Sequence, residues 1–176
     1  MNIIHKSIYN TLNMIIINKS GYLKYRDLQF KCALGKSGIG NKKIEGDKIT
    51  PRGTFDIIKI YYRSDRIKKL SSKFILIRIT KKMGWCDDPK SNSYNKEIKL
   101  PTKFNHEKLY RKDNIYDLIL VLNYNMKPVK KNAGSAIFIH IAKKFYKHTN
   151  GCIAVKKNHL MKLIAKMKKN TKIKIC

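Results

Sequence analysis

Short apolar runs separated by turn residues make up much of the chain. Between residues 12 and 34, turn signals at 18–21 and 26–27 separate runs of strand length, the clearest of which are residues 22–25 and 28–34. This spacing predicts a meander of short strands.

Four further runs continue the strand pattern. Residues 54–62 alternate between apolar and polar positions, which is typical of a strand with one buried face. Residues 74–79 and 116–122 are almost continuously apolar, which predicts strands buried on both faces. Residues 171–176 alternate again and predict an edge strand. With about eight or nine short strands, the chain is expected to be mainly β, a sandwich or a partly closed barrel.

One segment has helical spacing instead. Its apolar residues recur at i, i+3, i+4 and i+7, namely Leu160, Leu163, Ile164 and Met167. Asn158 precedes them and is a residue type that commonly caps a first helical turn. We therefore expect one or two short helices beside the strands, with this apolar face packed on the core.

Two stretches are predicted to be loops. Residues 35–40 are rich in glycine but lack the spacing of a phosphate-binding loop, so we expect a flexible connection. Residues 81–113 are long and polar with scattered aromatics, and such loops are uncommon in compact domains unless they serve function. We expect this segment to border an active site, with Trp85 exposed on a lid or wall. Its adjacent carboxylates, Asp87 and Asp88, point apart on extended backbone, which favours loop anchoring over paired acid–base catalysis.

The candidate chemistry lies within residues 134–155. His140 ends an apolar strand on which Ala136 and Phe138 share its face and three isoleucines share the other, so this strand is expected to be buried. Cys152 follows Gly151, whose freedom allows a sharp turn. A cysteine nucleophile needs a base and N–H groups directed at the oxyanion, and this stretch contains both. The alternative is that His140 is a satisfied core histidine and Cys152 a small buried hydrophobe.

The charges near this pair favour a reactive thiolate. A partner that stabilises the thiolate increases its population about tenfold for each unit by which the thiol pKa falls. We expect His140 to do this, with help from Lys143, Lys144 and Lys147. His148 is nearer in sequence but lies in a lysine-rich stretch and is expected at the surface.

The arrangement resembles the YkuD-type L,D-transpeptidase family, in which an upstream histidine precedes a Ser/Thr-His-Gly-Cys box. Here His140 precedes the sequence Thr-Asn-Gly-Cys at residues 149–152. Residues 45–55 look like the family's Thr-Pro-x-Gly-x-Phe segment. Residues 84–89, 94–95 and 134–138 look like a branch of the family with extra loops. The resemblance extends over residues 22–163.

This resemblance implies a peptidoglycan enzyme that forms a thioester on Cys152, with His140 as its base. Gly151, Asn150 and Thr149 would form the oxyanion and substrate-binding turn, and a backbone carbonyl, such as that of Ile141, would orient the imidazole. The partners would be peptidoglycan stem peptides, in the periplasm or cell envelope of a bacterium. No cofactor or metal is implied, and a monomer is expected.

Two departures from the family pattern keep a second interpretation open. Asn150 replaces the usual histidine of the box, and Ala154 stands where arginine or asparagine is common. A non-catalytic, cell-wall-binding member of the fold would fit these changes.

Length and charge complete the picture. The 176 residues are most simply one domain, 1–176, long enough to bury a core. Forty Lys and Arg against eleven Asp and Glu give a net charge of +29, so contact with an anionic cell envelope is plausible. A basic nucleic-acid-binding protein is the alternative from another class. However, only six of the cations are arginine and no nucleic-acid motif is present, so no specific nucleic acid is expected.

The four cysteines, Cys32, Cys86, Cys152 and Cys176, have no metal-binding spacing, and a Cys32–Cys86 disulfide is left open. The apolar residues 14–17 are too few for a signal-peptide core or a membrane span, so the sequence shows no export route.

Overall fold

The structure, a computed structural model, describes residues 13–176 and is built around one large sheet. The strands of this sheet are β1 (Met14–Ile17), β2 (Tyr22–Tyr25), β3 (Leu28–Ala33), β6 (Gly53–Tyr62), β7 (Leu76–Arg78), β11 (Leu118–Leu122), β12 (Phe138–Ile141), β13 (Ile153–Val155) and β14 (Lys172–Ile175). Their order is β11-β12-β13-β3-β2-β1-β14-β6-β7, and β6 also pairs with β11. This extra pairing closes eight strands into a ring. The prediction of a mainly β, barrel-like fold is confirmed.

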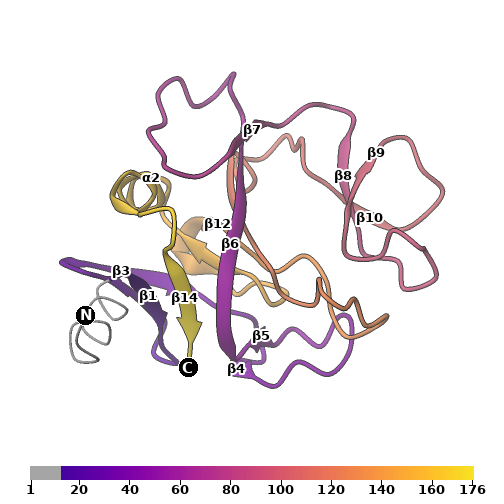
Figure 1. Ribbon diagram of the computed structural model, residues 1–176, viewed down its shortest axis with the longest axis horizontal. Helices are drawn as coiled ribbons and strands as arrows, with labels where there is room; N and C mark the ends of the chain where they lie inside the picture. Colours follow the sequence, from indigo (N-terminus) through magenta and orange to yellow (C-terminus); the bar gives the residue numbers. More distant parts are fainter. Residues whose placement is uncertain (1–12) are drawn as a thin grey trace, which may run out of the picture.

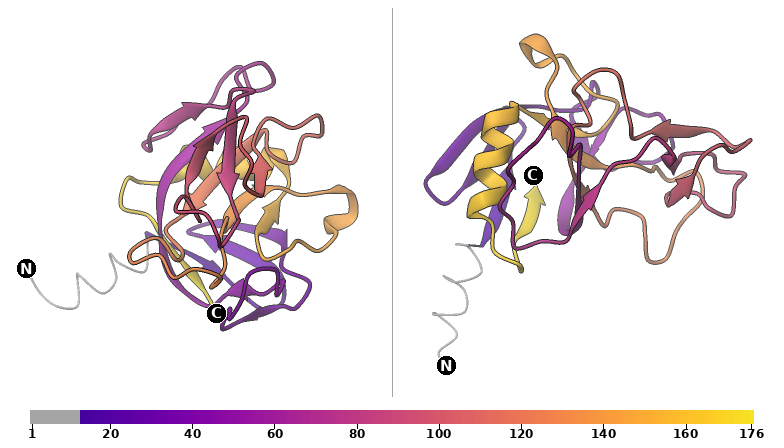
Figure 2. Two further views of the ribbon diagram at one scale, coloured as in Figure 1. Left: turned by 90° about the vertical axis from the view of Figure 1, so that its right-hand side faces the viewer. Right: turned by 90° about the horizontal axis from the view of Figure 1, so that it is seen from above.

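Smaller elements surround the ring. They are the two-stranded sheet of β4 (Ile39–Gly40) and β5 (Thr50–Pro51), the three-stranded sheet of β8 (Met83–Cys86), β9 (Glu97–Lys99) and β10 (His106–Lys108), the 3-10 turn η1 (Lys144–Tyr146) and the helix α2 (Lys157–Lys166). The sheet β8–β10 projects from one side of the ring, and α2 lies on the opposite side (Figure 1). The right-hand view of Figure 2 shows the same separation.

Strand β11 separates two hydrophobic clusters. Leu118, Leu120 and Leu122 point into the larger cluster, which also contains the apolar face of α2. Ile119 and Val121 point the other way, into a smaller cluster shared with residues of the inserted segment. All five side chains are fully buried. The continuous apolar run therefore does produce a strand buried on both faces, because the ring covers one face and the insertion covers the other.

Two strand predictions need correction. The run at 74–79 gives only the short strand β7, whose residues are half-buried or exposed, and Ile75 beside it is 69% exposed. β7 joins β6 outside the closed ring, so it is not covered on both faces. The strand predicted at 171–176 is present as β14, but it is not an edge strand. It pairs with β1 on one side and β6 on the other.

Several local predictions are confirmed and others are wrong in detail. The strands at 22–25, 28–34 and 54–62 appear as β2, β3 and β6, shifted by at most one residue at an end. Leu12, where the meander was expected to begin, lies outside the described residues. The loop at 35–40 is not simply a connection, because its last two residues form β4.

The helix has its expected buried face, with Leu160, Leu163 and Ile164 in the core. Its start was wrongly predicted. The N-cap position is Lys156, and Asn158 lies in the first turn, where its side chain accepts the backbone N–H of the next residue. No helix within residues 13–176 is long and apolar enough to cross a membrane.

The position of β14 generates the first testable prediction. Ile173 is fully buried at the centre of this strand, whereas Lys174 is exposed. Ile173→Ala should lower the free energy of unfolding by about 2–5 kcal/mol, because it removes core volume between β1 and β6. Lys174→Ala is the control and should change it by less than about 0.5 kcal/mol. Urea denaturation measures both, and equal effects would contradict the burial of Ile173 between β1 and β6.

Candidate active site

A pocket of about 480 Å³ opens where the turn at residues 149–152, strand β12 and the inserted segment meet. Cys152 and His140 both line it. The inserted segment contributes Asp87, Glu107 and Arg111, so the expectation that residues 81–113 border the candidate site is confirmed. Glu45 and Lys48, from the segment before β5, also line the pocket, which therefore brings together residues from distant parts of the chain.

The alternation of β12 directs His140 into this pocket. Ile139 and Ile141 point into the larger core, and Phe138 points into the smaller cluster on the opposite face. His140 shares the face of Phe138 and is 7% exposed. The strand thus presents the imidazole from a rigid element buried on both faces.

One hydrogen bond fixes the tautomer of His140. Nδ1 lies 3.0 Å from the carbonyl oxygen of Ile141. A carbonyl can only accept, so Nδ1 carries the hydrogen and donates it. In the neutral ring, Nε2 is then the unprotonated nitrogen and can accept a proton. The acceptor expected for the imidazole, the carbonyl of Ile141, is the one observed.

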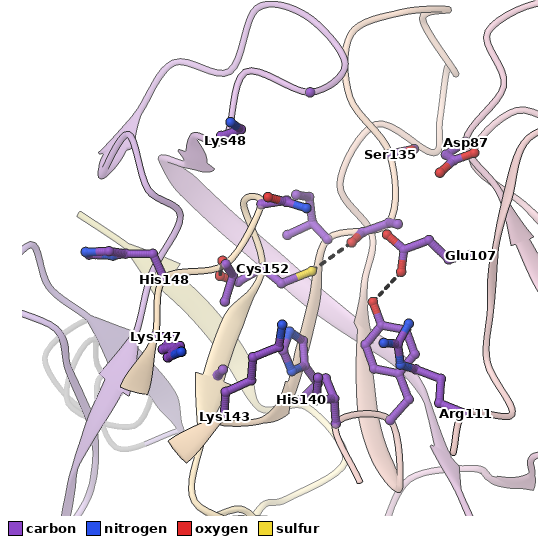
Figure 3. Close-up of a pocket in the computed structure, with 18 of the residues that line it drawn as sticks. Lys48, Asp87, Glu107, Arg111, Ser135, His140, Lys143, Lys147, His148 and Cys152 are labelled. Carbon is purple, nitrogen blue, oxygen red and sulfur yellow. Dashed lines mark hydrogen bonds between the residues drawn. The ribbon is translucent and has the colours of Figure 1, made fainter. Parts of the chain in front are cut away.

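The thiol of Cys152 is held by the backbone at the start of β12. Its Sγ donates to the carbonyl oxygen of Ala136 at 3.0 Å and accepts the N–H of Phe138 at 3.4 Å. β13 runs parallel to β12, with His140 opposite Ala154, which places Cys152 just before β13 on the same side as His140. Figure 3 shows the thiol and the imidazole facing the same space.

Thr149 shapes the turn that carries the cysteine. Its Oγ1 donates to the carbonyl of Cys152 at 2.5 Å and accepts the N–H of Gly151 at 3.1 Å. Its backbone N–H donates to the carbonyl of Leu34, just after β3, at 3.0 Å. The turn is therefore closed on itself and anchored to the ring.

The segment before β5 packs directly behind this turn and leaves no room for larger residues. Gly151 has φ +129°, and a Cβ there would lie 2.9 Å from the carbonyl oxygen of Ile49. At Gly35, which bridges to Thr149, a Cβ would lie 2.2 Å from the carbonyl oxygen of Lys48. The two segments quoted for the family resemblance, 45–55 and 149–152, thus contact each other through backbone.

Burial makes both reactive groups neutral. It raises the pKa of the Cys152 thiol to about 12 and lowers the pKa of the His140 imidazole to about 4. Glu107 also raises the thiol pKa. The expectation that His140 and nearby lysines would favour a thiolate is therefore wrong for this structure, because loss of hydration outweighs the solvent-exposed lysines.

The inserted segment supports the cysteine through Asn95. The Asn95 side chain accepts the N–H of Ala136 at 3.1 Å and the indole N–H of Trp85 at 3.0 Å. Ala136 in turn accepts the Cys152 thiol. Trp85 is 2% exposed, so its predicted role as an exposed wall is wrong and it is a core residue. Asn95 lies in a stretch that was quoted for the family resemblance, but the sequence did not predict its role as a support for the cysteine.

Tyr116 and its neighbours pack against the imidazole of His140. The phenol of Tyr116 donates to Glu107, and its ring packs edge-on against His140 with centroids 5.4 Å apart. Arg111 lies over the same ring, 5.2 Å from its centroid. Burial raises the pKa of Glu107. Reasoning from the sequence did not assign a role to any of these three residues.

The structure also places the other residues that were singled out in the sequence. Asn150, His148, Lys143 and Lys147 line the pocket. Asp88 has the anchoring role expected of it, because it accepts the N–H groups of Lys90 and Asn105. All four cysteines are free thiols, and only Cys176 is exposed. Within residues 13–176, no cluster of three or more His, Cys, Asp or Glu side chains could hold a metal ion.

Comparison with known proteins identifies the class of protein that this fold and site define. The family model of the L,D-transpeptidase catalytic domain, YkuD, matches residues 12–175, and the chain belongs to this family. Among solved structures it is similar to the helical cell shape determining protein Pgp2 from Campylobacter jejuni, with 17% sequence identity and a TM-score of 0.45. That match covers 92% of this chain and 46% of the other, so the chain spans about half of its length. No curated protein matches.

The pKa shifts generate a prediction for the free protein. Iodoacetamide should label the exposed Cys176 before Cys152 at neutral pH. With the other three cysteines replaced by alanine, the labelling rate of Cys152 should rise from about pH 8 to pH 11 without a plateau, because only the thiolate reacts and burial raises its pKa to about 12. A plateau below pH 7 would instead show a preformed thiolate–imidazolium pair.

The Thr149 hydroxyl can be tested by a matched pair of variants. Thr149→Val keeps the shape of the side chain but removes the partner of both the Cys152 carbonyl and the Gly151 N–H. It should lower the free energy of unfolding by about 1–3 kcal/mol, the cost of leaving such groups unpaired. Thr149→Ser keeps the hydroxyl and should recover most of this loss in urea denaturation. Equal losses would mean that the hydroxyl does not stabilise the turn.

Proposed function

We propose that this protein is a cysteine-dependent L,D-transpeptidase that acts on peptidoglycan stem peptides in the bacterial cell envelope, with residues 1–176 as one catalytic domain. Membership of the family gives the class. The observation that carries the assignment of residues is that Cys152 and His140 line one pocket, with the imidazole tautomer fixed by the Ile141 carbonyl.

The reaction begins from two neutral groups. The scissile carbonyl of the donor peptide enters beside Cys152, and the thiol leaves the Ala136 carbonyl and turns toward Nε2 of His140. The sulfur attacks the carbonyl carbon as Nε2 takes the thiol proton, so no stable thiolate is needed. The resulting imidazolium donates that proton to the leaving amine when the C–N bond breaks, which gives a thioester and a free D-amino acid.

The second half repeats these steps with another nucleophile. An amine of a second stem peptide attacks the thioester, His140 removes its proton, and the thiol is regenerated as the amide bond forms. Water in place of the amine gives hydrolysis, which makes the enzyme an L,D-carboxypeptidase. Both outcomes use the same base and the same pocket.

The oxyanion is stabilised by the turn that carries the cysteine. The N–H groups of Cys152 and Gly151 are the donors that we assign to the developing charge. The Gly151 N–H is bonded to Thr149 in the free protein, so it must exchange this partner for the oxyanion. Asn150 is exposed at the pocket wall and contributes substrate contact rather than proton transfer, since its amide does not titrate.

A carbapenem tests this function, because its strained carbonyl reports acylation of the cysteine directly. Mass spectrometry should show a covalent adduct on Cys152 in the wild type and none in Cys152→Ser. His140→Ala should slow the adduct by about 10²-fold or more, the usual contribution of a general base.

His148→Ala is the matched control, since it removes an exposed histidine from the same pocket, and it should slow acylation by no more than a few fold. The same variants should rank alike in turnover of a stem tetrapeptide. Absence of any adduct and any turnover in the wild type would leave a non-catalytic wall-binding protein. A large effect of His148→Ala with none of His140→Ala would reassign the base.

A further inference from the structure

One surface loop holds a large aromatic side chain in solvent. Residues 142–148, here called the Phe145 loop, connect β12 to the turn that carries Cys152. Phe145 is 81% exposed, more than any other large apolar side chain in the described residues 13–176. A single exposed apolar residue is common on protein surfaces. The conformation and the charges of the loop are therefore what distinguish this one.

The backbone holds Phe145 in its exposed position at a cost. Phe145 and Tyr146 have φ angles of +60° and +53°, in the left-handed region that bulky side chains rarely adopt. Two consecutive aromatic residues in this region destabilise the loop. Strained backbone of this kind persists only where the surrounding structure fixes it, and it is concentrated at functional sites. The exposure of Phe145 is thus imposed by the fold and is not a loose end of the chain.

The neighbouring Tyr146 supplies the anchor of the loop. Its ring is half-buried, and the Nζ atoms of Lys31 and Lys156 lie 5.5 Å and 5.9 Å from the ring centroid. Lys31 belongs to β3 and Lys156 directly precedes α2, so these cation–π contacts tie the loop to two elements. The two adjacent aromatic residues therefore differ in role, since Tyr146 packs against the protein and Phe145 points away from it.

The exposed ring is flanked by cations. The Nζ atom of Lys144 lies 5.1 Å from the centroid of the Phe145 ring. The exposed lysines of the loop and of its anchor are Lys31, Lys143, Lys144, Lys147 and Lys156. None of the ion pairs within residues 13–176 involves any of these five. Their charges are therefore free to pair with an anionic ligand, beside an apolar ring that also lacks cover.

We propose that the Phe145 loop is a docking site for the surface of an anionic lipid bilayer. The aromatic ring enters the region between headgroups and acyl chains, while the lysines pair with lipid phosphates. Long lysine side chains allow this, because they can keep the ammonium group at headgroup level while the apolar ring goes deeper. A soluble polyanion fits less well, because it would use the cations but leave the ring in water.

Docking in this way also orients the pocket. Lys147 and His148 belong to the Phe145 loop and line the pocket, on the side of Cys152 away from Asp87 and Glu107 (Figure 3). The pocket is therefore held next to the bilayer when the loop is bound. Phe145 itself does not line the pocket, so the docking does not depend on the reaction at Cys152.

A tryptophan placed in the loop tests insertion directly. The native Trp85 is 2% exposed in the smaller hydrophobic cluster and provides a constant background. Vesicles contain equal parts of phosphatidylglycerol and phosphatidylethanolamine, with or without brominated acyl chains, at physiological ionic strength. Fluorescence of the Phe145→Trp variant should shift to the blue and be quenched by the brominated lipid. Ile75→Trp is the matched control at another exposed apolar position, and it should show neither change.

Vesicle sedimentation measures how much the ring and the cations contribute. Phe145→Ser should weaken binding about fivefold or more, because burial of the ring is lost. Combining Lys31→Gln with Lys144→Gln should weaken it about fivefold for each lysine removed. Lys81→Gln with Lys99→Gln removes two exposed lysines from the inserted segment and should have an effect of about twofold at most, because distant charges are screened. Vesicles of phosphatidylcholine alone should bind weakly.

Three results would contradict the docking site. They are an unquenched Phe145→Trp variant on vesicles that bind the protein, equal losses from the two lysine pairs, and failure of the wild type to bind the vesicles. Binding to inorganic polyphosphate that competes with vesicles, without any quenching, would assign the lysines to a soluble polyanion instead. Acylation by a carbapenem without vesicles should be the same in Phe145→Ser as in the wild type, which separates this outcome from that of the proposed function.

Discussion

The site depends on one constraint, the burial of strands β11 and β12 on both of their faces. The period of two along β12 sends Ile139 and Ile141 into the ring and leaves Phe138 and His140 on the outside. On a bare barrel that outer face would meet water. The inserted sheet β8–β10 covers it with Trp85 and its neighbours, so the outer face becomes a second interior. The depressed pKa of His140 and the raised pKa of Cys152 both follow from this cover.

Backbone groups, rather than charges, hold the reactive pair in place. The carbonyls of Ala136 and Ile141 hold the thiol and the imidazole, and the Thr149 hydroxyl closes the turn between them. Carbonyl dipoles orient a group without fixing its protonation state, whereas a carboxylate beside His140 would favour the imidazolium. The thiol and the imidazole are therefore both neutral in the free protein. In the acyl transfer proposed above, such an environment would stabilise the transition state more than the resting state.

Sequence periodicity predicted well which face of a strand is buried, but it predicted poorly which strands pair with each other. It identified β12, the burial of His140 and the glycine–cysteine turn, because these depend on local alternation and on backbone freedom. It misplaced β14, since alternation shows which side chains are buried but not which strands lie beside them. The polar character of its segment led to the prediction that Trp85 is exposed, but the side chain is buried in the smaller hydrophobic cluster. The predicted shift of the Cys152 thiol pKa was wrong in direction. The sequence shows the nearby lysines, which lower this pKa, but the burial that raises it exists only in the folded protein.

The location of β14 has a consequence for the timing of folding. This strand, at residues 172–175, lies between β1 and β6, which both come from the first 62 residues of the sequence. A ribosome delivers residues in order, so β1 and β6 emerge long before the strand that joins them. Until then their edges are open, and the ring that supports His140 and Cys152 is incomplete. Because non-local pairings of this kind close slowly, the pocket that contains His140 and Cys152 is completed only after the last strand of the barrel has been synthesised.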